Sequence, residues 1–130
     1  MPRHPLGPYR LQAAISAVHA ESASWQTTDW GQILALYTLL HSLQPSPVVR
    51  INQTIALSYA HSPEAALTML DEANENGKLD RYQPYFAARA DLLARAGRRE
   101  DAKACFERAI HLSDNGSERA FLTSKAARLA

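Results

Sequence analysis

Histidine and cysteine are the side chains of this sequence best suited to a zinc site, and cysteine and serine are its candidate nucleophiles. No two histidines are four residues apart on one expected helix, and no cysteine lies close to any of them, so we expect no zinc site. The sequence also lacks the Gly-x-Ser-x-Gly motif of hydrolases and the glycine-rich loop that binds phosphate. We therefore predict a protein that is not an enzyme and needs no cofactor or metal. The histidines are His4, His19, His41, His61 and His111.

The single cysteine, Cys105, falls on the apolar side of an expected helix, next to Phe106. A small hydrophobic residue packed in the core is a better interpretation of this position than a nucleophile. One cysteine cannot form an internal disulfide, which favours a reducing, cytoplasmic location. The longest apolar run is too short to cross a membrane, so we expect no membrane partner.

Basic side chains gather between residues 95 and 108, and they are the best candidates for contacts with nucleic acid. Three acidic residues interrupt this cluster, and the net charge of the whole chain is only +1. A solvated face whose charges compensate one another is therefore favoured over a phosphate-binding patch, and we expect no direct binding of nucleic acid. The basic residues are Arg95, Arg98, Arg99, Lys103 and Arg108, and the acidic ones are Glu100, Asp101 and Glu107.

The helices that would position these residues are predicted most clearly between Pro84 and Asn115. Apolar or small residues recur there with the three-and-four spacing of one-sided helices, on either side of Gly97. Glycine adopts the positive φ that ends a helix without a Cβ clash. Ala90 and Ala102 are small where two antiparallel helices would approach closely. This pattern resembles a tetratricopeptide repeat (TPR), a helical hairpin that must stack on similar hairpins to bury its apolar face.

The remaining sequence predicts further helices and no strand. Ser46-Pro47 and Ser62-Pro63 each place a serine cap before a proline at the first helical position, and Thr27 or Thr28 could cap the second helix. We predict one all-α domain over residues 8–130, after a flexible lead-in of residues 1–7, built as a right-handed stack of three hairpins and a C-terminal capping helix. The expected helices are Pro8–Ala23, Asp29–Leu43, Pro47–Tyr59, Pro63–Asn76, one that begins between Asp80 and Pro84 and ends at Gly97, Arg98–Leu112, and Glu118–Leu129 with Phe121 and Leu122 facing inward.

Five segments in order cover most of the chain and resemble the C-terminal TPR-like extension of bacterial extracytoplasmic-function (ECF) sigma factors. They are GPYRLQAAISAVHA (7–20), TDWGQILALYTLL (28–40), PSPVVRINQTIAL (45–57), ARADLLARAGR (88–98) and ERAFL (118–122). The sequence departs from that family at Arg10 and Gln53, where glutamine and arginine are usual, so roles are not carried over at these two positions.

The resemblance implies a regulatory domain that binds protein and controls promoter-specific transcription initiation. Its partners would be the promoter-reading sigma domains or RNA polymerase. A free-standing TPR adaptor that captures a peptide of an unrelated protein is the alternative. An upstream reading frame that encodes DNA-binding helices would distinguish the two.

In a TPR stack the first helix of each hairpin lines a concave groove, and the resemblance therefore implies the binding residues. The candidates are Arg10 and Gln12 in the first hairpin, Asn52 and Gln53 in the second, and Ala88, Asp91 and Arg95 in the third.

Charge is distributed unevenly along the chain. Residues 1–70 contain only six of the 27 Asp, Glu, Lys and Arg residues, whereas aromatic residues such as Trp25, Trp30 and Tyr37 occur there. Interfaces are depleted in charge and enriched in aromatic residues at their centres. We therefore expect a weakly charged, apolar patch on the first two helices, which would pack against the sigma domains or form a homodimer. The alternative is that the uncharged polar residues there simply face water.

Overall fold

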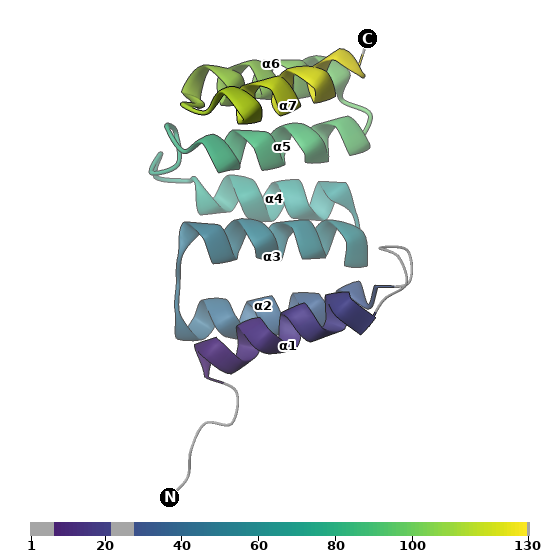
Figure 1. Cartoon of the computed structure of the whole chain (residues 1–130), viewed down its shortest axis with the longest axis vertical. Helices are drawn as coiled ribbons and strands as arrows, with labels where there is room; N and C mark the ends of the chain where they lie inside the picture. The colour runs from purple at the N-terminus through teal and green to yellow at the C-terminus, as the bar shows by residue number, and fades with distance from the viewer. Residues whose placement is uncertain (1–6, 22–27, 130) are drawn as a thin grey trace, which may run out of the picture.

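The structure, a computed structural model, describes residues 7–21 and 28–129, and these form seven α-helices and no sheet. The all-α prediction is thus confirmed. The helices lie across the long axis of the molecule and follow one another from α1 to α5, and α6 and α7 overlap at the C-terminal end in this view (Figure 1). Their bounds are α1 Pro8–Glu21, α2 Trp30–Leu43, α3 Pro47–Ala60, α4 Pro63–Ala73, α5 Gln83–Arg95, α6 Arg99–Leu112 and α7 Gly116–Ala127.

Side-chain caps fix where most of these helices begin. The hydroxyls of Ser46 and Ser62 accept hydrogen bonds from the amides of Val49 and Ala65, both at 3.1 Å. Each serine satisfies an amide that has no partner within its own helix. Asp29 caps α2, because its carboxylate accepts from the amide of Gln32 at 3.0 Å. The prediction that a threonine caps this helix is wrong for Thr28, and Thr27 lies outside the described residues.

Gly97 ends α5 as predicted, with φ +82°. The amide of Arg98 donates to the carbonyl of Leu93 at 2.9 Å, and the amide of Gly97 donates to that of Ala94 at 3.1 Å. This pair of bonds is the Schellman motif, which satisfies carbonyls at the end of a helix and requires a left-handed residue.

Helix α4 ends at Ala73, three residues before its predicted end. The side chain of Asn74 accepts from the amide of Leu79 at 2.7 Å and donates to Asp80 at 2.8 Å. Asn74 thereby organises the connection to α5 instead of continuing the helix. At the other end of the chain, Asn115 caps α7, so this helix begins at Gly116, two residues earlier than predicted.

Two clusters of buried side chains form the core, and α3 contributes to both. The smaller cluster joins α1, α2 and α3 and includes Leu11, Ile33 and Val49. The larger cluster runs from α3 to α7 and includes Ala90 and Ala102, both 0% exposed. Consecutive helices pack against each other, and α3 also contacts α5. Within the described residues, no helix is long and apolar enough to cross a membrane.

Candidate protein-binding groove

A groove of about 430 Å³ runs over α3, α5 and α7. Ile51 and Leu122 contribute apolar walls, and Ala87 and Ala88 of α5 are small, which leaves the space open. Polar side chains from all three helices complete the lining. The residues are Ile51, Asn52, Ile55, Gln83, Pro84, Ala87, Ala88, Asp91, Glu118, Phe121, Leu122 and Lys125.

Asp91 is the charged centre of this groove. Its carboxylate lies 3.1 Å from Nζ of Lys125 on α7 and 3.9 Å from Nη1 of Arg95 one turn further along α5. The side chains of Asp91 and Lys125 are 38% and 30% exposed, so both stay accessible to a ligand. The ion pair therefore joins α5 to α7 and presents both signs of charge on one side of the groove.

Arg95 connects the groove to the α2–α3 half of the molecule. Its Nη1 donates to the hydroxyl of Ser58 at 2.8 Å, and its guanidinium carbon lies 3.9 Å from the ring centroid of Tyr59. The Tyr59 ring stacks in turn on Trp30, with centroids 4.5 Å apart. One arginine on α5 thus contacts α3, and Tyr59 of α3 in turn stacks on Trp30 of α2.

The structure brings four of the seven predicted site residues together. Asn52, Ala88 and Asp91 line the groove, and Arg95 lies beside Asp91. Arg10 and Gln12 are exposed on α1, and neither belongs to the groove lining. Whether any of these residues binds a partner stays a prediction.

Gln53 does not line the groove, and this corrects its prediction. Its side chain is buried, with 4% exposure. It accepts a hydrogen bond from Arg50 Nη1 at 3.0 Å and donates one to Thr38 Oγ1 on α2 at 3.0 Å. Adjacent residues of a helix point about 100° apart, so Asn52 faces the groove while Gln53 faces α2. Gln53 holds two helices together.

Helix α7 supplies groove residues that the sequence analysis missed. Phe121 was predicted to face inward but is 62% exposed, whereas its neighbour Leu122 is 3% exposed, as predicted. The two residues cannot both face the core, for the same geometric reason as Asn52 and Gln53. Treating α7 as the first helix of a further hairpin would have placed Phe121 and Lys125 at the groove.

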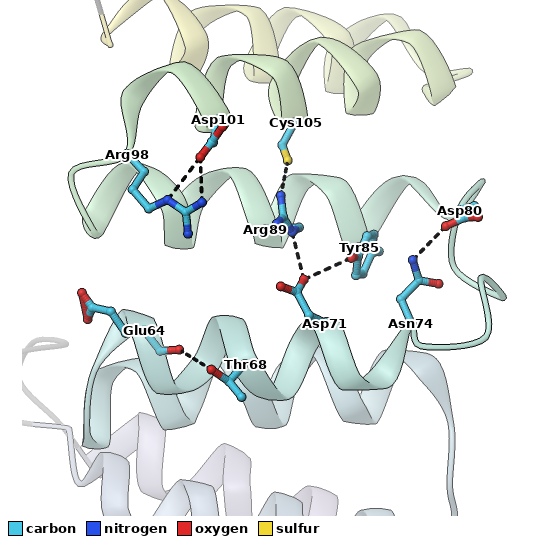
Figure 2. Close-up of polar contacts among 10 residues, drawn as sticks. All are labelled: Glu64, Thr68, Asp71, Asn74, Asp80, Tyr85, Arg89, Arg98, Asp101 and Cys105. Carbon is cyan, nitrogen blue, oxygen red and sulfur yellow. Dashed lines mark hydrogen bonds and ion pairs between the residues drawn. The ribbon is translucent and has the colours of Figure 1, made fainter.

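A separate polar network lies between α4, α5 and α6 (Figure 2). Arg89 Nε donates to Asp71 at 3.0 Å, its Nη1 donates to Sγ of Cys105 at 3.2 Å, and the Tyr85 hydroxyl donates to Asp71 at 3.4 Å. Burial lowers the pKa of Arg89, but the bonds to Asp71 and Cys105 raise that pKa by more, so Arg89 stays charged. Burial is the main reason why the pKa of Tyr85 is raised.

Cys105 is 7% exposed, and its Sγ accepts a hydrogen bond from Arg89. The network therefore links α4, α5 and α6.

The basic cluster around α6 is largely paired within the molecule. Arg98 contacts Asp101 through two nitrogens, at 3.2 and 2.8 Å (Figure 2). Arg108 donates to the backbone carbonyl of Asp80 at 3.2 Å, and Arg95 is held by Asp91 and Ser58. These contacts favour the interpretation of a self-compensating face. Among the described residues, no group of three His, Cys, Asp or Glu side chains could hold a metal ion.

Comparison with known proteins gives one informative relative. The chain is 44% identical over 124 residues to an uncharacterized protein of Rhizobium meliloti (strain 1021). The match covers 95% of this chain but only 29% of that protein. No family model and no solved structure matches the chain.

Proposed function

We propose that this chain is a TPR-like regulatory domain of the ECF sigma-factor type, which acts by binding protein. The observation that carries the proposal is the groove, because Asn52, Ala88 and Asp91 from α3 and α5 line it together with residues of α7. A groove lined by every second helix is the arrangement expected of stacked hairpins. It is an open site with apolar walls and a few polar groups, which suits an extended or helical segment of another protein.

Three further features support a stack of three hairpins with α7 as the cap, and its right-handed turn is part of the proposal. Consecutive helices pack in order, and α3 contacts α5 across the intervening helix. The turn at Gly97 has the hydrogen bonds of a short helical hairpin. Ala90 and Ala102 are both fully buried on adjacent helices, where the repeat needs small side chains.

The assignment to sigma factors depends on the five segments that resemble their C-terminal extension. A sigma factor that carries this extension would be considerably longer than this chain, as the Rhizobium protein is. In the proposed mechanism the groove holds a segment of the promoter-reading domains or of RNA polymerase, in the cytoplasm, and so biases engagement of the promoter. The pairing of arginines with acidic groups and a backbone carbonyl around α6 supports contact with protein instead of nucleic acid.

The test measures binding of the chain to the promoter-reading sigma domains, and to RNA polymerase, of the bacterium that encodes it. Asn52→Ala and Asp91→Ala together should weaken binding by about tenfold or more, because residues at the centre of an interface dominate its free energy. Glu107→Ala changes an exposed residue on α6, outside both the groove and the first two helices, and should leave binding unchanged. Unaltered binding and transcription in the folded double variant would contradict the proposal. Binding only to peptides of unrelated proteins would favour the adaptor alternative.

A further inference from the structure

A second cavity, of about 330 Å³, shares no lining residue with the groove. It lies where the α2–α3 connection, the start of α3, the end of α4 and the α4–α5 connection meet. Its lining residues are His41, Pro45, Ser46, Pro47, Arg50, Ala73, Lys78 and Leu79. The volume is at the small end of the range found for ligand sites in proteins, so a small molecule or ion would fit.

The charges that line this cavity are all of one sign. Arg50 comes from α3 and Lys78 from the α4–α5 connection, and no lining residue is acidic. One guanidinium nitrogen of Arg50 donates to Gln53. A guanidinium carries five N–H groups, so this bond leaves others available to a ligand.

His41 lines the same cavity, and its ring is sensitive to charge placed there. Its Nδ1 is buried and has no hydrogen-bond partner in the structure. A buried polar atom without a partner is rare in folded proteins and costs free energy. Burial and, to a lesser extent, the charge of Arg50 lower the pKa of His41, so the ring is neutral at neutral pH. Because Nδ1 is shielded from solvent, an anion in the cavity would act on the His41 ring through its charge.

The start of α3 faces the same space, since its cap Ser46 and first residue Pro47 line the cavity. The N-terminal end of a helix carries partial positive charge and favours anions. We propose that this cavity binds a small phosphate-type anion, either inorganic phosphate or the phosphate of a phosphomonoester, held by Arg50 and Lys78 next to His41. The site is distinct from the protein-binding groove and does not depend on the function proposed for it.

The test is an NMR titration of the ¹⁵N-labelled full chain at pH 7 and constant ionic strength. Inorganic phosphate and glycerol phosphate are added separately, with chloride as the reference. Saturable shifts should appear for the amides of Lys78 and Leu79, and Lys78→Gln should weaken binding at least about fivefold, since it removes one of two formal positive charges. Tighter binding of glycerol phosphate would identify the phosphomonoester as the source of the anion, and tighter binding of inorganic phosphate the free ion.

The pKa of His41 gives a second measurement. Phosphate would not change this pKa if the lining residues only stabilised the fold. Arg50 and Lys78 are the charged groups that line the cavity with it, so a bound anion should raise this pKa toward its ordinary value. Lys103→Gln on α6 makes the same change of charge at an exposed site outside the cavity, and it should bind phosphate like the wild type. Absence of saturation, equal weakening in Lys103→Gln, or an unchanged His41 pKa at saturating phosphate would overturn the proposal.

Discussion

At the scale of single residues, neighbours along a helix have different roles in this protein. Asn52 lines the groove whereas Gln53 is buried against α2, and Phe121 is exposed whereas Leu122 belongs to the core. Arg95 contributes both to the groove and to stability, because it contacts Asp91, Ser58 and Tyr59. A substitution in the groove therefore has to be checked for its effect on stability before any loss of binding is interpreted.

Arg95→Met tests how much Arg95 contributes to stability. The variant keeps much of the aliphatic packing but loses the bond to Ser58 and the cation–π contact with Tyr59. With about a quarter of the side chain exposed (26%), we expect a loss of about 1 to 2 kcal/mol in the free energy of unfolding. Urea denaturation measures it. Arg99→Met on the exposed surface of α6 is the control and should be close to neutral; a similar loss there would contradict the assigned contacts.

His41 gives the stability a predictable dependence on pH. Its pKa is lowered in the folded state by burial and by Arg50, so the unfolded chain takes up the proton first as the pH falls. The contribution of neutral His41 is present above about pH 6.5, the ordinary histidine pKa, and decreases below it. Unfolding free energies at pH 7.5 and 5.5 should therefore differ less in His41→Gln than in the wild type. An identical difference in both proteins would be evidence against this effect.

At the scale of elements, the α5–α6 hairpin depends on a backbone turn and on close helix packing. The α5–α6 turn requires Gly97 at φ +82°, and the facing helices bury Ala90 and Ala102 completely. Arg89 adds a polar clamp from α5 to its neighbours on both sides, α4 and α6. Local turn chemistry and side-chain size thus act together to hold consecutive helices in contact.

Gly97→Ala isolates the cost of the turn. A Cβ at this position would meet no atom within 4 Å, so the penalty comes from the left-handed backbone alone. We expect a loss of about 1 to 2 kcal/mol and a melting temperature lower by several degrees. Gly116→Ala is a matched control, because its Cβ would also meet nothing within 4 Å and its φ is not positive. Equal melting of the two variants would mean that Gly97 carries no special strain.

Ala102→Leu tests the close approach of α5 and α6. Ala102 is 0% exposed, so the three added carbon atoms must displace packed neighbours. Overpacking of this kind typically costs about 1 to 3 kcal/mol. Thermal melting should show a decrease of several degrees, whereas Ala104→Leu, on the exposed side of the same helix, should melt like the wild type. A wild-type melting curve for Ala102→Leu would argue against the hairpin assignment.

At the scale of the whole molecule, charge is concentrated in the C-terminal half. In α1, Gln12, Ala13, Ser16 and Ala17 are exposed together with Arg10, which gives a surface of small side chains with one positive charge, and Leu43 at the end of α2 is 41% exposed. The expected patch on the first two helices thus contains few large apolar side chains among the described residues, and Trp25 lies outside them. Burial of this surface against sigma domains or against a second copy remains a prediction.

Sedimentation of the isolated chain tests self-association through α1 and α2. We expect a dimer that dissociates on dilution, and Ala17→Glu, which places a charge on the exposed face of α1, should give a monomer. Ala104→Glu introduces the same charge on the exposed face of α6 and should sediment like the wild type. A monomer at all concentrations would show that the polar residues of α1 and α2 simply face water in the isolated chain.

The sequence by itself determined the helical class and placed most helix ends within a few residues. Ser46, Ser62 and Gly97 act on backbone groups within a few positions along the chain, so their effect follows from local order. Burial of Ala90 and Ala102 was predictable for a similar reason, because the repeat-like spacing defines one face of each helix.

The tertiary structure decided which neighbouring helix packs against each of the other helix faces. Gln53 is buried because Thr38 of α2 lies opposite it, and Lys125 reaches Asp91 across 34 residues of sequence. The second cavity joins His41, Arg50 and Lys78, which come from three separate parts of the chain. No local pattern encodes such contacts, because they depend on the packing of helices that are distant in sequence.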